Sequence, residues 1–270
     1  MANSQSGTAL ITGASSGIGS AYADRLAERG FDLILVARSG ERLRALASAI
    51  SDRTGRSVEV VQADLTDPHD LFRVESLLRA DQSVTLLVNN AGIGATKPLL
   101  ESDVDAMERM IDLNVTAAMR LAYAAAPGFA ARGTGTIVNI ASVVAVGPER
   151  LNGVYGGTKA FLLALSQSLH HELADRGVRV QAVLPGATAT RFWSSLGTPL
   201  ESLPSRIVMS TEAMVGAALA GLDQGELVTI PSLPDSADWA RFEDARLALQ
   251  PNLSRAEPAA RYGSPQRRAA

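Results

Sequence analysis

The sequence has no cysteine, two lysines and three histidines among its 270 residues. Without cysteine, the chain has no disulfide bonds, no thiolate metal sites and no cysteine nucleophile, and a reducing compartment is weakly favoured. The pair His171-Glu172 is followed by Asp175, where the H-E-x-x-H zinc motif requires a second histidine. We therefore expect no metal site.

A strong charge of one sign, a targeting segment and long apolar runs are also missing. The formal net charge is -3 and no run of Lys or Arg forms a stripe, so nucleic acid is not expected as a partner. The segment from Met1 to Gly7 lacks the charged and apolar regions of a signal peptide, and no apolar stretch reaches membrane-spanning length. We expect a cytoplasmic protein that does not contact a membrane.

What the sequence does have is an ordinary globular composition, with 46% apolar and 20% charged residues. A chain of this length can fold as one large α/β domain. Apolar runs rich in Val, Ile and Leu recur along it without alternating with polar residues, which is typical of parallel strands covered on both faces. The seven predicted strands are residues 8–12, 31–37, 58–62, 84–88, 136–140, 178–184 and 227–230.

Segments with helical spacing of apolar residues separate these runs. The alternation predicts a doubly wound α/β fold of the Rossmann type, in which a seven-stranded parallel sheet carries helices on both faces within a single domain, residues 1–250. The proline-containing loop 186–210 is typical of a substrate-binding loop, and residues 251–270 are expected to form a C-terminal tail. The predicted helices are residues 17–29, 41–53, 68–80, 102–126, 155–176 and 211–222.

A glycine-rich loop follows the first predicted strand and opens the first predicted helix. Free backbone N–H groups and the positive helix end make such a loop a binding place for a nucleotide pyrophosphate. A tight turn without a ligand would use the same glycines. The loop runs from Thr12 to Gly19, and its candidate cofactor-binding residues are Gly13, Ser15, Ser16, Gly17, Ile18 and Gly19.

The segment from Gly13 to Gly17 also matches the G-x-S-x-G elbow, which presents a nucleophilic serine in hydrolases. An elbow needs an oxyanion-hole loop from an earlier strand, but only seven residues precede the first predicted strand. His170 and His171 lie in the middle of a predicted helix. A serine hydrolase is therefore a minor alternative.

The end of the second predicted strand bears on the choice between NAD and NADP. An NAD-binding fold has an acidic residue there, which binds the adenosine ribose hydroxyls. This chain has Ala37 and Arg38 instead, and a guanidinium can bind a 2′-phosphate with its planar set of donors. We expect NADP(H) to be preferred over NAD(H), with a solvated surface arginine as the alternative for Arg38.

Tyr155 and Lys159 are four residues apart in a predicted helix, and Lys159 is one of the two lysines. Helical spacing makes their side chains neighbours. A phenol with a pKa of ~10 needs about 4 kcal/mol of phenolate stabilisation to exchange protons near neutral pH, and an adjacent ammonium lowers its pKa. The pair is predicted to work in acid/base catalysis, and a solvated helical pair is the alternative.

Three segments of the chain have the forms T-G-x-x-x-G-x-G, N-N-A-G and Y-x-x-x-K, namely residues 12–19, 89–92 and 155–159. Together they resemble the motifs of the short-chain dehydrogenase/reductase family over about residues 7–230, and no motif of that family is missing. The family's serine stands 13 residues before its tyrosine, a spacing that this chain reproduces. The resemblance implies a catalytic tetrad of Asn114, Ser142, Tyr155 and Lys159.

The same resemblance implies further contacts with the cofactor. The family's P-G-x-x-x-T segment corresponds to residues 185–190, on the nicotinamide side. Structural explanations stay open, since Asp64 can cap a turn, residues 89–92 can form a tight loop and Ser142 can satisfy backbone groups. The implied contacts are Asp64 and Leu65 beside the adenine, Asn90, Ala91 and Gly92 in the cleft, Tyr155 and Lys159, and Pro185, Gly186, Thr188 and Thr190.

The expected reaction is hydride transfer between NADP(H) and a small-molecule carbonyl or alcohol substrate. Tyr155 is expected to exchange the proton with the substrate oxygen, and Ser142 to donate a hydrogen bond to that oxygen. Lys159 is expected to lower the tyrosine pKa, and Asn114 to hold a water that returns the proton through Lys159. Two alternatives remain, a non-catalytic NADP(H)-sensing binding protein and an epimerase or dehydratase that uses the cofactor transiently.

The loop after Gly186 weakly favours an apolar or aromatic carbonyl substrate, although core packing would explain its side chains equally well. The family resemblance also implies a homo-oligomer, a dimer or tetramer, formed through residues 117–126 and the helix that carries Tyr155. The loop residues behind the substrate prediction are Phe192, Trp193, Leu196, Leu200 and Leu203.

Overall fold

The structure is a computed structural model that describes residues 7–263 of the chain. The chain splits into two compact units, Met1–Pro231 and Ser232–Ala270. Among residues 7–263, no helix is both long and apolar enough to cross a membrane. The first unit contains the sheet and all the predicted site residues.

A parallel sheet of seven strands runs through the described part of the first unit. Its order is β3-β2-β1-β4-β5-β6-β7, so the direction of winding reverses between β1 and β4. Ligands of doubly wound folds bind beyond the carboxyl ends of the strands at such a reversal. The predicted fold class is confirmed. The strands are β1 Thr8–Thr12, β2 Asp32–Ala37, β3 Val58–Gln62, β4 Val84–Asn89, β5 Gly135–Ile140, β6 Val178–Val183 and β7 Val228–Thr229.

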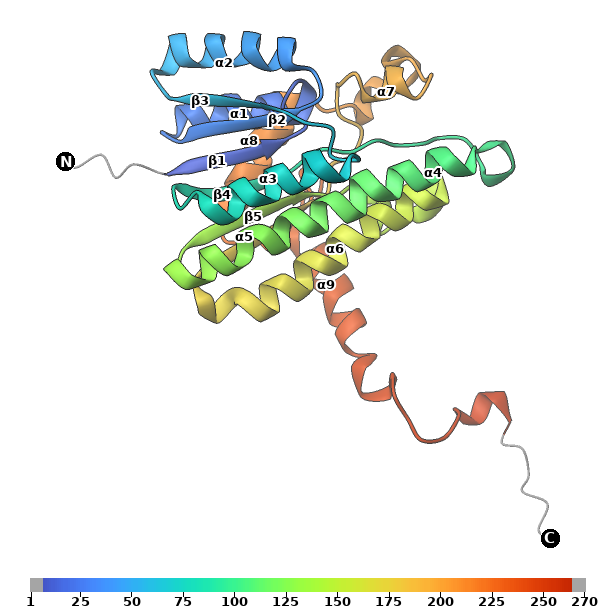
Figure 1. Cartoon of the computed structure of the whole chain (residues 1–270). Coiled ribbons are helices and arrows are strands. Elements are labelled where there is room, and N and C mark those ends of the chain that lie inside the picture. The colour runs from blue at the N-terminus through green and yellow to red at the C-terminus, as the bar shows by residue number, and fades with distance from the viewer. Residues whose placement is uncertain (1–6, 264–270) are drawn as a thin grey trace. The chain divides into compact units, whose positions relative to one another are not determined.

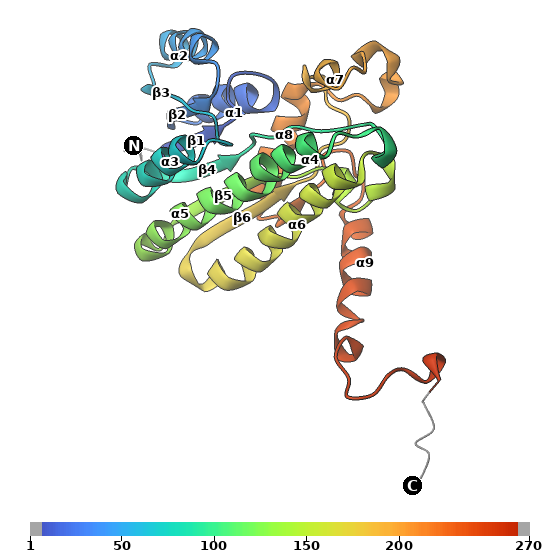
Figure 2. The ribbon, with the colours of Figure 1, turned by 45° about the vertical axis from the view of Figure 1, so that its right-hand side comes forward.

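Helices cover both faces of this sheet, as Figure 1 and Figure 2 show. Helices α1, α2 and α8 bury apolar residues in one cluster with the sheet, and α3, α5 and α6 do so in a second cluster. Each of these helices thus packs its apolar side against the sheet. The helices of this unit are α1 Gly17–Glu28, α2 Gly40–Thr54, α3 Pro68–Ala80, α4 Val104–Ile111, α5 Ala118–Arg132, α6 Gly153–Leu173, α7 Phe192–Ser195 and α8 Thr211–Asp223.

The central strands are buried along their whole length, as β1 and β5 illustrate. Neighbouring residues of one strand point to opposite faces, so Leu10 joins one core cluster and Ile11 the other. Because both faces are covered, both positions are apolar, and this is why the sequence shows continuous apolar runs rather than alternation. Burying each such side chain contributes about 1.5–3 kcal/mol before the cost of ordering the chain.

The helix predicted over residues 102–126 is longer and contains an irregular turn. It begins as α4 after Asp103, whose side chain accepts a hydrogen bond from Asp105 N, and it ends as α5 before Gly133, which has a φ of 66°. Between α4 and α5 the chain forms a π-helical turn, Asp112–Ala117, and turns of this kind are frequent at functional sites. Asn114 lies in this turn.

The second unit contains helix α9, Ser236–Leu247, which the sequence analysis did not predict. The helix starts where the Asp235 side chain accepts a hydrogen bond from Ala237 N. None of its residues is buried, and charged residues are interspersed among its apolar ones, which weakens the periodic pattern. The unit boundary at Pro231 precedes the predicted domain end at residue 250, and the assignment of residues 1–250 to one catalytic domain stays a prediction.

The predicted tail, residues 251–270, lies only partly within the described residues. Short 3-10 turns cover Gln250–Asn252 and Ala260–Tyr262. Residues 264–270 lie outside the described part of the chain.

Candidate active site

A cleft of about 1020 Å³ opens at the carboxyl ends of the strands. Segments that follow the first six strands of the sheet form its walls, and they come together because parallel strands point their carboxyl ends to one edge. Of the predicted site residues, Gly19 and Asn114 do not line the cleft. Those that do are Gly13, Ser15, Ser16, Gly17, Ile18, Arg38, Asp64, Leu65, Asn90, Ala91, Gly92, Ser142, Tyr155, Lys159, Pro185, Gly186, Thr188 and Thr190.

The glycine loop has a backbone that requires glycine. Gly13 and Gly17 have φ values of 64° and 59°, in the left-handed region that side chains disfavour. A Cβ atom on Gly13 would lie 2.8 Å from Asn90 Nδ2, so the loop has no room for a side chain there. Ser16 precedes α1 without making a side-chain cap, which leaves first-turn N–H groups open toward the cleft. The loop therefore fits an anionic group such as a pyrophosphate.

The segment after β4 braces this loop. Asn90 Nδ2 donates to the Thr12 carbonyl oxygen at 2.8 Å, and Thr12 Oγ1 accepts hydrogen bonds from Asn90 N and Ala91 N, both at 3.0 Å. A Cβ atom on Gly19 would lie 2.5 Å from the Gly13 carbonyl oxygen, so Gly19 lets α1 pack closely against the loop. Gly19 thus affects the position of the glycine loop although it does not itself line the cleft.

The adenine end predicted from the sequence lies after β2 and β3. Arg38 lines the cleft there, together with Arg42 one helical turn further on, which the motifs did not identify. Asp64 Oδ1 accepts hydrogen bonds from Thr66 N at 3.0 Å and Thr66 Oγ1 at 2.8 Å. Burial acts to raise the pKa of Asp64, but the two hydrogen bonds from Thr66 and the nearby Arg38 charge together hold it below its usual value. Asp64 is therefore ionised at neutral pH.

Tyr155 and Ser142 meet at the centre of the cleft. The Asn152 side chain accepts hydrogen bonds from Val154 N and Tyr155 N, which starts α6 at Gly153 and puts Tyr155 in its first turn. Ser142 follows β5, and its Oγ donates to the Pro185 carbonyl oxygen and accepts from Val144 N, both at 3.4 Å. Burial raises the pKa of Tyr155 to about 12, although the Ser142 side chain acts to lower it. The phenol is therefore protonated at neutral pH.

Lys159 is buried one helical turn along α6 from Tyr155. Its Nζ donates to the Ile140 carbonyl oxygen at 2.9 Å and lies 5.8 Å from the centroid of the Tyr155 ring. Burial lowers the pKa of Lys159 to about 8. The sequence analysis predicted that the pKa of Tyr155 is lowered, whereas in the structure it is raised. Desolvation of the phenol acts on this pKa more strongly than the neighbouring polar groups do.

Asn114 supports the cleft wall from behind. Its Nδ2 donates to the Ile93 carbonyl oxygen at 2.8 Å and to Thr158 Oγ1 at 3.1 Å, and its Oδ1 accepts from Ile93 N at 2.9 Å. These bonds fix the chain just after Gly92, where an added Cβ would lie 3.0 Å from Asn114 Oδ1 and 3.5 Å from Lys159 Nζ. The predicted role of Asn114 in holding a water stays a prediction.

Aromatic side chains from α7 close around Tyr155. Phe192 packs on Tyr155 with ring centroids 5.8 Å apart, and Trp193 meets Phe192 edge-on at 5.6 Å. Trp193 Nε1 also donates to the Thr188 carbonyl oxygen at 3.0 Å, which holds the indole against the strand-end loop. Of the loop residues that suggested an apolar substrate, Phe192, Trp193 and Leu203 line the cleft, and Leu196 and Leu200 do not.

Several lining residues have no motif of their own. Some, such as Ile93 and Val143, directly follow a predicted site residue, and this adjacency is the signal that would have identified them. Others come from segments whose sequence gives no indication of a site. The lining residues in this second group include Arg109, Arg150, Leu151 and Ile207.

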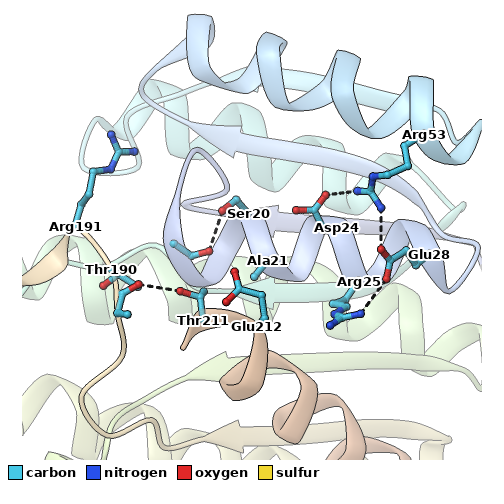
Figure 3. Close-up of a pocket in the computed structure, with 12 residues that line it drawn as sticks. Ser20, Ala21, Asp24, Arg25, Glu28, Arg53, Thr190, Arg191, Thr211 and Glu212 are labelled. Carbon is cyan, nitrogen blue, oxygen red and sulfur yellow. Dashed lines mark hydrogen bonds and ion pairs between the residues drawn. The ribbon is translucent and has the colours of Figure 1, made fainter. Parts of the chain in front are cut away.

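A second hollow of about 630 Å³ lies beside α1 and the start of α8 (Figure 3). Its charged side chains mostly satisfy one another, since Arg53 pairs with both Asp24 and Glu28, and Arg25 pairs with Glu28. Arg191 points away from these carboxylates (Figure 3). Mutual pairing leaves little unsatisfied charge for a ligand, so we assign no function to this hollow.

The geometry gives no support to a metal site or to a serine nucleophile. Within residues 7–263, no group of three or more His, Cys, Asp or Glu side chains is arranged to hold a metal ion. His170 and His171 lie in the last turn of α6, and neither lines the cleft that contains Ser15. A hydroxyl at Ser15 therefore has no histidine base beside it in the cleft.

Solved structures with this architecture include close relatives. A short-chain dehydrogenase from Sphingobium yanoikuyae, solved in complex with NADPH, is 50% identical and has a TM-score of 0.92, over 95% of this chain and 99% of that one. A bulky-bulky ketone specific alcohol dehydrogenase from Comamonas testosteroni is 45% identical with a TM-score of 0.89, over 97% of this chain and 100% of that one. Both likenesses extend over nearly the whole of each chain.

Among curated proteins, hydroxysteroid dehydrogenase-like protein 1 of Gallus gallus is 33% identical over 188 residues, which is 69% of this chain. The present chain spans only 57% of the length of that protein. The sequence profile described as short chain dehydrogenase matches residues 7–200 of this chain. With this match, and with half of its residues identical to those of a solved short-chain dehydrogenase, the chain belongs to the short-chain dehydrogenase/reductase family of oxidoreductases.

Proposed function

We propose that this enzyme transfers a hydride between NADP(H) and a ketone or secondary alcohol, with Tyr155 as the catalytic acid/base. The observation that carries the proposal is the placement of Ser142, Tyr155 and Lys159 in the same cleft as the uncapped start of α1. A buried phenol beside such a glycine loop suits proton exchange with a substrate that reacts with the nicotinamide.

The cleft contains groups suited to each part of the cofactor. When bound, NADPH supplies the hydride. The glycine loop and the N-terminus of α1 would hold the pyrophosphate, and Asp64 and Leu65 would flank the adenine. Lys159 would hold the nicotinamide ribose, and the segment from Pro185 to Thr190 would contact the nicotinamide side.

Proton transfer rests on Tyr155 and Ser142. In the reductive direction, the Tyr155 hydroxyl donates its proton to the substrate oxygen, and Ser142 donates a hydrogen bond to the same oxygen. The raised pKa of Tyr155 keeps the phenol in the protonated form that this step requires. Lys159, one turn away, supplies positive charge that stabilises the phenolate left behind. Asn114 acts as a positioning residue, because its bonds fix the wall beside Lys159.

A preference for NADP(H) over NAD(H) rests on the end of β2. Arg38 and Arg42 both line the cleft there, and paired guanidinium groups suit the 2′-phosphate of NADP. The Sphingobium yanoikuyae relative was solved with NADPH, which supports the same choice.

The substrate we propose is a bulky ketone with apolar groups. Phe192, Trp193 and Leu203 line the cleft around Tyr155, so a substrate carbonyl that reaches the phenol lies among apolar and aromatic surfaces. The Comamonas testosteroni relative is specific for bulky-bulky ketones, which supports this class.

The test is to follow NADPH and NADH oxidation by the purified protein with aryl ketones, aliphatic ketones and small ketoses. Tyr155→Phe removes the transferable proton and keeps the ring, so we expect it to lower kcat by at least about 100-fold while NADPH still binds. Tyr123→Phe is the matched control, because Tyr123 is exposed on α5 and does not line the cleft.

Each outcome of this assay decides between the candidate functions. Turnover of aryl ketones that is lost in Tyr155→Phe and kept in Tyr123→Phe supports the proposal. Full activity in Tyr155→Phe contradicts the role of Tyr155. Tight NADPH binding without turnover of any carbonyl favours the NADP(H)-sensing alternative, and turnover without net cofactor consumption favours an epimerase or dehydratase.

A further inference from the structure

Most of the charged side chains that line the cleft are positive. Asp64 is the one acidic side chain among its described lining residues, and it lies after β3. Cations line the cleft along its length: Arg38 and Arg42 after β2, Lys159 beside Tyr155, Arg191 before α7, and Arg109 and Arg150 on other segments. The nucleotide accounts for the first two, whereas Arg109 and Arg150 need another explanation.

Arg109 and Arg150 belong to the part of the cleft that surrounds Tyr155. Tyr155 forms a small buried cluster with Met110 of α4, and Leu151 packs against this cluster. Arg109 directly precedes Met110, and Arg150 directly precedes Leu151. Both guanidinium groups therefore come from segments that pack around Tyr155, far along the sequence from the glycine loop.

Neither guanidinium has a tight partner in the described structure. The ion pair between Arg109 and Asp103 spans 3.8 Å, and the Arg109 side chain is 60% exposed. The Arg150 side chain makes no hydrogen bond or ion pair with residues 7–263 that meets ordinary distance criteria. Arg150 Nε and Glu149 Oε1 both lie near Gly147, 3.1 Å and 3.5 Å from the position of an added Cβ, and Glu149 does not line the cleft. Because Arg109 has only this long ion pair and Arg150 has none among the described residues, both can bind an anion in the cleft.

Apolar side chains line the cleft together with these two cations. Leu151 and Phe192 pack around Tyr155, and Leu203 and Ile207 also line the cleft. A molecule whose carbonyl reaches Tyr155 therefore shares the cleft with both apolar surface and guanidinium groups.

We propose that the substrate is a bulky ketone that carries a carboxylate remote from its carbonyl, and that Arg109 and Arg150 bind this carboxylate. The planar guanidinium fork matches a carboxylate, and a cleft wall without acidic side chains near Tyr155 favours an anion over a cation. This inference rests on the proposed function, since it extends the same site to a substrate class.

The test compares 4-benzoylbenzoate with its methyl ester, because the two ketones share the benzophenone framework but differ in charge, and the ester is the more electrophilic of the two. With NADPH, we expect the wild-type enzyme to have a kcat/KM at least about tenfold higher for the acid, mainly through a lower KM. In the double variant Arg109→Gln/Arg150→Gln, the ratio of the two kcat/KM values should fall to about one. Arg176→Ala, outside the cleft, should keep the wild-type ratio.

Two further measurements separate this inference from the proposed function. The preference for the acid should weaken as NaCl is raised, because an exposed guanidinium is screened by salt. Isothermal titration of NADPH-saturated protein with each ketone reports the same preference without requiring turnover. An equal kcat/KM for acid and ester, or a preference that survives in the double variant, contradicts the inference and leaves the proposed function intact.

The absence of any turnover contradicts the proposed function, and the titration then decides the inference. Tighter binding of the acid by wild type than by the double variant supports the carboxylate site. Equal binding of acid and ester overturns it.

Discussion

At the scale of single residues, burial shifts two pKa values in the cleft in opposite directions. Burial raises the pKa of Tyr155 to about 12 and lowers the pKa of Lys159 to about 8, because it disfavours the charged form of each group. Near pH 7 the phenol is protonated, and the lysine, one pH unit below its pKa, is about 90% charged. The proton donor and its supporting charge therefore coexist at neutral pH.

The two shifts predict how ketone reduction depends on pH. As the pH rises above about 8, Lys159 loses its charge, whereas Tyr155 keeps its proton until the pH approaches 12. We expect kcat for reduction at saturating NADPH to fall above pH 8, measured from about pH 6 to about pH 10. Lys159→Gln has no charge to lose, so it should have a lower kcat and a flatter profile. A wild-type kcat that stays constant to the upper end of this range contradicts the prediction.

Arg38 carries a second prediction at this scale, on cofactor choice. Removing a charge-assisted hydrogen bond to a phosphate costs about 1.5–3 kcal/mol. Arg38→Ala should therefore raise the KM for NADPH by about 10- to 100-fold and change the KM for NADH little. Steady-state kinetics with both cofactors make the comparison, and Arg176→Ala is the control. An equal change in both KM values would assign Arg38 to structure instead.

At the scale of elements, the π-helical turn between α4 and α5 ties the loop after β4 to α6. Asn114 makes three hydrogen bonds there, two with Ile93 and one with Thr158. The turn thus sets the position of the wall beside Lys159, and Leu113 of the same turn lines the cleft.

Asn114→Ala should both destabilise the fold and slow the reaction. The variant leaves the Ile93 N–H and C=O groups without their partner, at a cost of about 1–3 kcal/mol for each buried group that finds no water. Urea unfolding measures the loss of stability. A lower kcat for ketone reduction reports that the cleft wall beside Lys159 has moved. Asn252→Ala, in the second unit, is the matched control and should change neither quantity. Unfolding identical to that of the wild type would show that the three bonds carry no net stability.

At the scale of the whole molecule, we propose that the protein is a homo-oligomer that associates through α5 and α6. The two helices lie side by side on one face of the sheet, as both views of the fold show (Figure 1, Figure 2). Tyr123 on α5 is 61% exposed, so a substitution there changes the surface of the proposed interface.

The proposal predicts a particle mass of at least twice the 28.3 kDa of the chain in size-exclusion chromatography with light scattering. Tyr123→Arg puts a charge into the proposed interface and should shift the protein toward monomer. Phe72→Arg is the matched control, because Phe72 on α3 is 60% exposed and lies outside the proposed interface. A monomeric wild-type protein, or equal effects of the two variants, would contradict an interface at α5.

Local sequence was enough to predict most of the fold and much of the site. The strands were predictable because parallel strands buried on both faces are continuously apolar, and the glycine loop and the Tyr155–Lys159 pair were recognisable because each lies within a few consecutive residues. Helix α9 was missed because charged residues are interspersed among its apolar ones, so that its periodic pattern is weak.

Tertiary structure alone decided the properties that depend on residues far apart in the chain. The pKa of Tyr155 follows from burial by several segments, including the Phe192 ring that packs on it, and its direction cannot be obtained from the spacing to Lys159. Arg109 and Arg150 line one cleft because α4 and the turn before α6 both contribute to the packing around Tyr155. Motifs determine which chemistry the chain can carry, because they are local, whereas desolvation and charge clustering are set by packing between distant segments.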